Sequence, residues 1–160
     1  MTRPHSKAVP MSELSPLLIG LIEENVDVTI LVTGNSMRPM LTHLRDTVVL
    51  TKCDPSALKK GDIPLYLREN GQYVLHRILK VHSDCYDISG DNQWELEKGV
   101  KHTQILCKVK GFTRHGKYHS VDEPFYRIYE KVWRMLFSCR KYIKRVYQTI
   151  HSLLKRKDKK

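Results

Sequence analysis

Ser36 lies in a short segment that could support nucleophilic catalysis. It follows a predicted strand and Gly34, in the sequence Thr33-Gly34-Asn35-Ser36-Met37. A nucleophilic serine needs an exposed turn of this kind, with backbone N–H groups nearby to stabilise an oxyanion. A Gly-x-Ser turn is equally typical of a serine that caps a short helix after a strand. Its chemistry therefore depends on which side chains lie beside it.

His76 is the histidine best placed to act as a base for such a serine. A serine hydroxyl needs a proton acceptor at neutral pH, and histidine titrates near that range. The chain has eight histidines, and His76 lies within an alternating apolar segment, on the face of Val74 and Ile78. A polar ring on an apolar face needs a hydrogen-bond partner or a cleft. A hydrogen-bonded core histidine is the alternative interpretation.

Asp91 places a carboxylate in a turn that follows the next predicted strand, in the sequence Ser89-Gly90-Asp91-Asn92-Gln93. An aspartate there could orient His76 and stabilise its charged form. The alternative is an ordinary Asx-turn, which a Gly-Asp-Asn sequence forms without any catalytic role.

Taken together, these segments resemble the sequence boxes of type I signal peptidases, whose superfamily includes the self-cleaving phage and SOS repressors. The matching segments are Ser36-Met37-x-Pro39, Lys60-Gly61-Asp62-Ile63, His76-Arg77-Ile78 and Gly90-Asp91-Asn92. The resemblance covers about residues 32–92, and weakly 104–109. It implies a mainly β peptidase fold in which Ser36 attacks a peptide carbonyl and the Ser36 backbone N–H stabilises the oxyanion.

The resemblance also implies the roles of the remaining site residues. His76 stands where the usual bacterial enzymes have a lysine base, as in the archaeal and endoplasmic-reticulum branch, and a histidine pKa starts near ~6.5. Asp91 is the first choice for the acid that orients His76, and Glu97, six residues on, is the second. Met37 and Pro39 are expected to fix the turn and line the substrate cleft. No metal or organic cofactor is implied.

The elements that must position these residues are predicted from periodicity and turn signals. Strands are predicted over about 28–32, Thr47–Lys52, Ile63–Arg68, Tyr73–Val81, Cys85–Ser89 and Gln104–Phe112. Asn70-Gly71 is the clearest hairpin signal. A short helix is expected over about 12–24, starting at Ser15-Pro16. The prediction is a mainly β fold, either a folded sandwich or a partly closed barrel, with a short N-terminal helix.

Charge divides the 160-residue chain into unequal parts. Residues 1–123 contain 16 Lys/Arg and 15 Asp/Glu, whereas residues 124–160 contain 12 and 2, so +10 of the net charge of +11 lies in the last 37 residues. That segment also has an apolar stripe in steps of three and four, which predicts a long basic amphipathic helix. The stripe comprises Phe125, Tyr129, Val132, Leu136, Cys139, Ile143, Val146, Ile150 and Leu153. We therefore predict a flexible N-terminus (1–11), a peptidase-like β domain (12–123) and a basic helix and tail (124–160).

The basic helix suggests a membrane partner. No apolar run approaches the ~18 residues needed to cross a bilayer, so we expect a cytoplasmic protein, peripheral at the cytoplasmic face of the membrane. An amphipathic helix with a ring of Lys/Arg suits an anionic membrane surface. The alternatives are docking on the β domain, pairing as a coiled coil, or binding nucleic acid. Nucleic acid ranks last, because phosphate contacts do not cover an apolar stripe.

The leading hypothesis is a serine endopeptidase that cleaves a signal- or leader-like peptide through an acyl-enzyme on Ser36. The alternative is a non-catalytic peptidase-like binding module, or a scaffold tethered to membrane or partner by the basic helix. Repressor-type self-cleavage at Ala-Gly is excluded, because neither Ala8 nor Ala57 precedes a glycine. Four cysteines without a Cys-x-x-Cys pair argue against a zinc ribbon. The substrate and the oligomeric state are not predicted.

Overall fold

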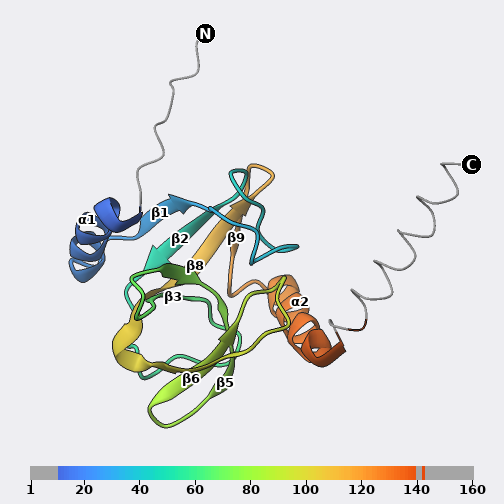
Figure 1. The fold of residues 1–160 in the computed structure, drawn as a ribbon. Coiled ribbons are helices and arrows are strands. Elements are labelled where there is room, and N and C mark those ends of the chain that lie inside the picture. The colour runs from blue at the N-terminus through green and yellow to red at the C-terminus, as the bar shows by residue number, and fades with distance from the viewer. Residues whose placement is uncertain (1–10, 140–141, 143–160) are drawn as a thin grey trace, which may run out of the picture.

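The computed structural model describes residues 11–139 and 142, and the fold is mainly β with a helix near each end of this range (Figure 1). In chain order the elements are α1 (Met11–Glu23), β1 (Val28–Leu31), β2 (Thr47–Thr51), β3 (Pro64–Leu67), β4 (Tyr73–Leu75), β5 (Arg77–Val81), β6 (Cys85–Ser89), β7 (Glu97–Lys101), the 3-10 helix η1 (His102–Gln104), β8 (Ile105–Arg114), β9 (Lys117–Ser120), α2 (Pro124–Met135) and the 3-10 helix η2 (Leu136–Cys139). The predicted fold class is confirmed at this level.

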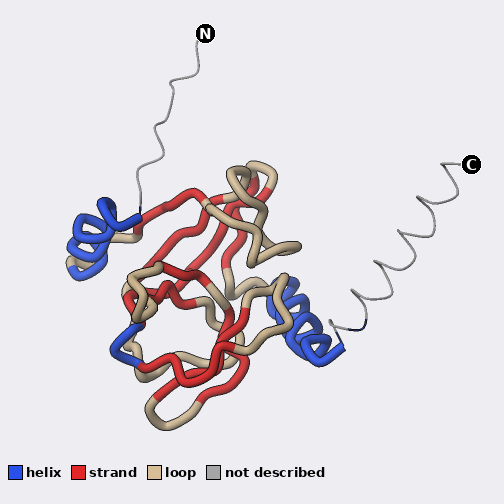
Figure 2. The backbone as a smooth tube through the Cα atoms, in the orientation of Figure 1, coloured by secondary structure: helices blue, strands red, loops and turns tan. Residues whose placement is uncertain are grey.

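The strands form two antiparallel sheets (Figure 2). The large sheet has the order β1-β2-β8-β3-β4, with β9 paired to β8, and the small sheet has the order β5-β6-β7. The hairpin predicted at Asn70-Gly71 joins β3 to β4. Strands β1 and β4 are the two ends of the large-sheet order, so each has an edge that can accept another strand.

The core consists of two apolar clusters. One cluster lies between α1 and the large sheet and includes Leu18, Val48 and Phe112. The other lies between the two sheets and includes Tyr66 of β3 and Ile88 of β6, strands that lie in the lower half of Figure 1. The chain crosses from the first sheet to the second between β4 and β5, at His76.

Several details differ from the sequence predictions, among them β9, which no predicted strand covers. The strand predicted over Tyr73–Val81 is broken at His76, because the chain changes sheets there. Strand β7 was not predicted, because Glu-Lys-Gly-Val-Lys lacks apolar alternation and becomes a strand by pairing with β6. Helix α1 begins at Met11, so Pro16 lies inside the helix and not at its start.

The predicted C-terminal helix begins at Pro124 as expected and continues to Met135. The rest of the predicted helix and tail, apart from η2 and Tyr142, lies outside the described residues, as do residues 1–10 of the predicted flexible N-terminus. Tyr126 and Glu130 are buried against the body, whereas Phe125 of the predicted apolar stripe is exposed. Of the residues described, none belongs to a helix long and apolar enough to span a bilayer.

Candidate active site

Ser36 lies in a tight turn after β1 that begins at Gly34. Gly34 has φ +100°, a backbone conformation that residues other than glycine rarely adopt. Its N–H donates to His43 Nδ1 at 2.8 Å. Residues 36–40 continue as turns and do not form the helical turn expected from the sequence. Ser36 is half-buried, and the next residue, Met37, is buried in the core of the large sheet. Core packing of Met37 therefore anchors the turn that presents Ser36.

His76 is the corner residue between the two sheets and is only 3% exposed. The segment that includes Gly61 and Asp62 holds the chain immediately after it. The Ile78 N–H donates to the Asp62 carbonyl, and the Gly61 N–H donates to the Ile78 carbonyl, both at 2.9 Å. The segment Lys60–Ile63 thus fixes the start of β5, and with it the position of the imidazole.

Gly90 is the point where the serine and histidine segments meet. A Cβ placed on Gly90 would lie 2.6 Å from the Ser36 carbonyl oxygen and 3.1 Å from His76 Nε2, so only glycine fits between them. The Asn92 N–H donates to the Ser36 carbonyl at 2.7 Å, and the Asn92 amide donates to the Asn35 carbonyl at 3.2 Å. The Gly90–Asn92 turn therefore joins two segments that are far apart in the sequence.

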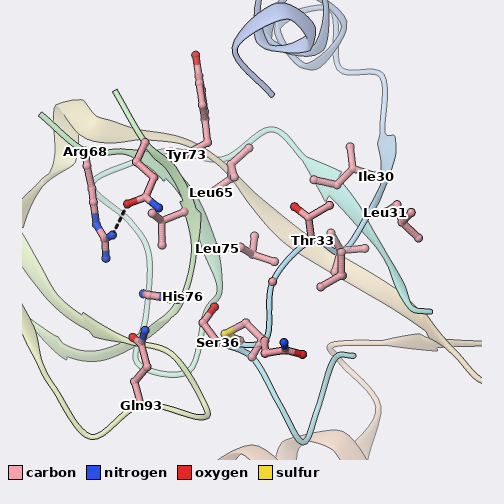
Figure 3. A pocket seen from close by; sticks show the side chains of 17 residues that line it. Ile30, Leu31, Thr33, Ser36, Leu65, Arg68, Tyr73, Leu75, His76 and Gln93 are labelled. Atoms are coloured by element: carbon pink, nitrogen blue, oxygen red, sulfur yellow. Dashed lines mark hydrogen bonds between the residues drawn. The ribbon is translucent and has the colours of Figure 1, made fainter. Parts of the chain in front are cut away.

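Ser36 and His76 line one pocket together with Gln93 (Figure 3). Residues of β1 and the following turn form one wall, and residues of β4 form the other. The aliphatic and methionine side chains of the lining are those of Ile30, Leu31, Val32, Met37, Val48, Leu65, Val74 and Leu75. The described residues make no hydrogen bond between the Ser36 hydroxyl and the His76 ring. In the absence of substrate, catalytic hydrogen bonds are often long and tighten only in the complex.

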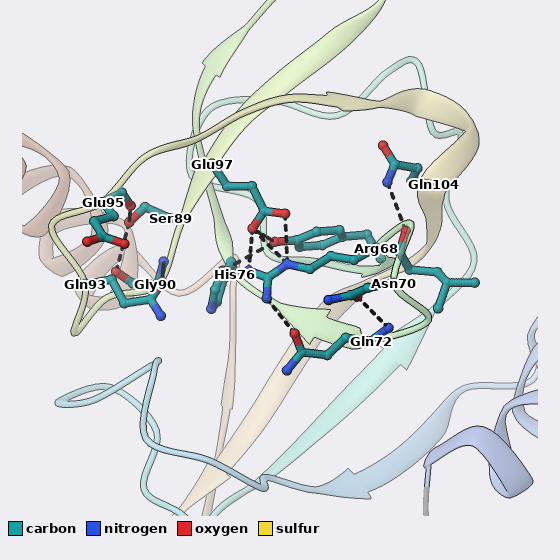
Figure 4. Close-up of polar contacts among 12 residues, drawn as sticks. Arg68, Asn70, Gln72, His76, Ser89, Gly90, Gln93, Glu95, Glu97 and Gln104 are labelled. Carbon is teal, nitrogen blue, oxygen red and sulfur yellow. Dashed lines mark hydrogen bonds and ion pairs between the residues drawn. The ribbon is translucent and has the colours of Figure 1, made fainter.

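Tyr66 connects His76 to Glu97 (Figure 4). The Tyr66 hydroxyl donates to Glu97 Oε2 at 2.7 Å and lies 3.4 Å from His76 Nδ1. Because the tyrosine proton points at the carboxylate, the tyrosine oxygen is available to accept from Nδ1–H. That arrangement leaves the unprotonated Nε2, on the Gly90 side, as the basic nitrogen of the ring.

Arg68 binds Glu97 and places a positive charge near His76. Its Nε donates to Glu97 Oε1 at 2.9 Å, and its Nη2 donates to Oε2. Burial, followed by the positive charge of Arg68, lowers the pKa of His76 from 6.5 to about 4, while the Glu97 charge opposes the shift. Burial opposes ionisation of Glu97, but hydrogen bonds from Arg68 and Tyr66 lower its pKa overall. The imidazole is therefore neutral at pH 7, as a general base must be.

Asp91 binds Arg77. Arg77 Nε donates to Oδ1 at 2.8 Å and Nη2 to Oδ2 at 2.7 Å, with the side chains 0% and 1% exposed. The sequence analysis placed Asp91 first and Glu97 second as the acid that orients His76, and the contacts favour the opposite order. A buried arginine must be neutralised, and the guanidinium next in sequence to His76 holds both carboxylate oxygens of Asp91.

The Arg77–Asp91 pair extends into helix α2. Arg77 Nη1 donates to the Tyr126 hydroxyl at 2.9 Å and to the Gly61 carbonyl at 3.0 Å. The Trp133 indole N–H donates to the Asp91 carbonyl at 3.1 Å. The helix therefore braces the turn that joins Ser36 to His76, although it contributes no side chain to the pocket.

Met37 and Pro39, the other predicted site residues, differ in their position relative to the pocket. Met37 lines the pocket, whereas Pro39 is exposed and lies outside the pocket lining, because the turn has passed the pocket by that residue. Sequence analysis missed Tyr66 and Arg68. Their spacing of two within a predicted strand puts both on one face, which was the available signal.

Among residues 11–139 and 142, no group of three or more His, Cys, Asp or Glu side chains is arranged to hold a metal ion.

Comparison with known proteins does not place the chain in a family. No known family matches the sequence, and no curated protein matches it. The resemblance to signal peptidases therefore stays a prediction from the four sequence segments.

Proposed function

We propose that the protein is a serine endopeptidase resembling type I signal peptidases, with Ser36 as nucleophile and His76 as general base. The observation that carries the proposal is the meeting of the two segments at Gly90, where the Ser36 carbonyl oxygen and His76 Nε2 both lie within about 3 Å of the position that a Cβ would take. The pocket beside them is lined by both side chains.

The proposed reaction uses the tautomer that the Tyr66 contact favours. Ser36 Oγ attacks the peptide carbonyl carbon as its proton passes to His76 Nε2, and the Ser36 N–H stabilises the oxyanion. The C–N bond then breaks, His76 returns the proton to the leaving amine, and an acyl-enzyme remains on Ser36. A water molecule gives its proton to His76 and attacks the ester, which releases the acid and restores the hydroxyl.

Glu97 stabilises the charged intermediate in this scheme. The imidazole gains a positive charge when it accepts the serine proton, and the Glu97 carboxylate raises the pKa of His76. The negative charge acts through the Tyr66 hydroxyl that lies between the two groups. Glu97 is therefore a positioning and electrostatic residue in this proposal, and Asp91 maintains the turn.

The pocket suits an extended peptide. Its walls come from β1 and β4, the two ends of the large-sheet order, and an extended substrate can add to such edges through main-chain hydrogen bonds. Ile30, Leu65 and Leu75 add apolar side chains to a lining that also contains polar groups. These features support a signal- or leader-like substrate with an apolar residue near the scissile bond.

Labelling with a serine-reactive penem, followed by mass spectrometry, tests the proposal. We expect one adduct per chain, located on Ser36, and loss of the adduct in both Ser36→Ala and His76→Gln. Ser56→Ala is the matched control, because Ser56 is exposed and distant from the pocket, and it should label normally. Full labelling of the Ser36→Ala protein would refute the proposal.

A peptide-binding module without catalysis is the second candidate. The lack of a hydrogen bond between Ser36 and His76 in the described part of the chain favours it. Binding and cleavage can be separated by incubating the protein with a mixture of extended apolar peptides. Capture of intact peptides with equal affinity by wild type and Ser36→Ala, together with failure of the penem to react, would establish the binding module.

A further inference from the structure

Helix α2 has an outer side that the body does not cover. Phe125, Ile128, Val132 and Met135 are 84%, 62%, 50% and 81% exposed. Their spacing of three, four and three places them along one side of the helix. We call these four residues the outer face. The opposite side, with Tyr126 and Glu130, is the side that packs on the body.

The outer face is unusual for a surface helix, because four large apolar side chains lie in contact with water. Single exposed apolar residues are common, but a contiguous row marks an interaction site. Arg127 and Lys131 are exposed on the flank of the row. Residues 124–160 together have a net charge of +10. The partner must therefore cover apolar side chains and tolerate a high positive charge.

We propose that the outer face of α2 binds an anionic membrane surface, with the helix lying in the plane of the interface. Such a surface offers an apolar layer to Phe125 and Met135, and negative headgroups to Arg127 and Lys131. A second copy of the chain would bring two strongly positive segments together, which is unfavourable. Nucleic acid would neutralise the charge and leave the apolar row in water.

Membrane binding would also hold the candidate active site close to the lipid surface. The side of α2 opposite the outer face holds the Asp91 turn through Trp133 and Tyr126. A helix is about 10 Å across, so the turn that joins Ser36 to His76 lies close behind the lipid surface. This consequence depends on the proposed peptidase function, whereas the binding itself does not.

Vesicle flotation of the full chain tests the proposal. The vesicles are phosphatidylcholine alone, or phosphatidylcholine with about a third phosphatidylglycerol. We expect binding to the anionic vesicles, and binding about tenfold weaker or worse for Phe125→Ser/Ile128→Ser/Met135→Ser, because three apolar side chains are lost. The control Leu17→Ser/Leu44→Ser changes exposed leucines elsewhere and should bind as wild type does.

Further variants separate the contributions. Arg127→Gln/Lys131→Gln should weaken binding to anionic vesicles by about fivefold for each charge removed. Ser36→Ala should float like wild type, so a failed peptidase proposal leaves this result unchanged. Equal flotation of wild type and the triple serine variant would overturn the proposal. Equal binding to both vesicle types, or dimers in sedimentation that the triple variant abolishes, would also overturn it.

Discussion

Two arginine–carboxylate pairs flank His76, and they differ in burial. Arg77 and Asp91 are 0% and 1% exposed, whereas Arg68 and Glu97 are 30% and 29% exposed. Both are bidentate, yet their surroundings differ. The buried pair connects the Gly61 segment, the Asp91 turn and helix α2. In the half-exposed pair, Arg68 lines the pocket and Glu97 connects to His76 through Tyr66. From this comparison we infer that one pair supports the structure and the other adjusts the pKa of His76.

Breaking the buried pair should have the largest effect. Asp91→Ala leaves the Arg77 guanidinium buried without its counter-ion, which costs about 3–5 kcal/mol of the free energy of unfolding. Urea denaturation measures the loss. The matched variant Glu97→Ala should cost at most about 1 kcal/mol, because that pair is partly in water. Equal losses in the two variants would contradict the distinction.

Replacing both Arg77 and Asp91 gives a second test of the buried pair. Arg77→Met/Asp91→Leu removes the buried charges together, so its loss of stability should be smaller than the sum of the two single losses. Strict additivity would mean that the charges of Arg77 and Asp91 do not interact, and that their contacts with helix α2 account for the whole effect.

Stability should depend on pH through His76. The unfolded chain protonates this residue below about pH 6.5, whereas burial and Arg68 lower the pKa in the folded chain to about 4. Between these values the unfolded state binds more protons, so stability falls with falling pH by up to about 1.4 kcal/mol per pH unit. His76→Gln should flatten this part of the curve in urea titrations. An unchanged slope would contradict the shift.

The half-exposed pair should shift the pH dependence of acylation. Removal of the positive charge in Arg68→Gln raises the pKa of His76. The acid limb, which is the fall in the penem acylation rate at low pH, should therefore shift to higher pH by roughly one pH unit at low salt. Glu97→Gln removes the opposing charge and should move the limb down. Equivalent shifts from a change in a distant ion pair, such as Lys110→Met, would indicate a general charge effect.

The smallest effect is expected for the replacement of Gln72, which accepts a hydrogen bond from Arg68 of the half-exposed pair. Arg68 Nη1 donates to Gln72 Oε1 at 2.7 Å in an exposed position. Gln72→Ala should therefore lower stability by no more than about 1 kcal/mol and leave the acid limb in place. A shift as large as that of Arg68→Gln would show that the position of Arg68, and not only its charge, determines the basicity of His76.

The local features of this protein can be predicted from neighbouring residues. Alternation located β2 with Val48 and Leu50 buried, Asn70-Gly71 located a hairpin, and Pro124 marked the start of α2. The order of the Ser36, His76 and Gly90 segments singled out three pieces of chain that the fold brings together. These features depend on residues close in sequence, whose periodicity and turn chemistry act before distant contacts form.

The partners of the polar groups depend on long-range contacts. Arg77 binds Asp91, Tyr66 links His76 to Glu97, and the charged segment of β7 becomes a strand by pairing with β6. The face of α2 that packs on the body was likewise set by Tyr126 reaching Arg77. Each of these outcomes depends on partners far away in the chain, and the pattern of neighbouring residues does not determine which partner is chosen.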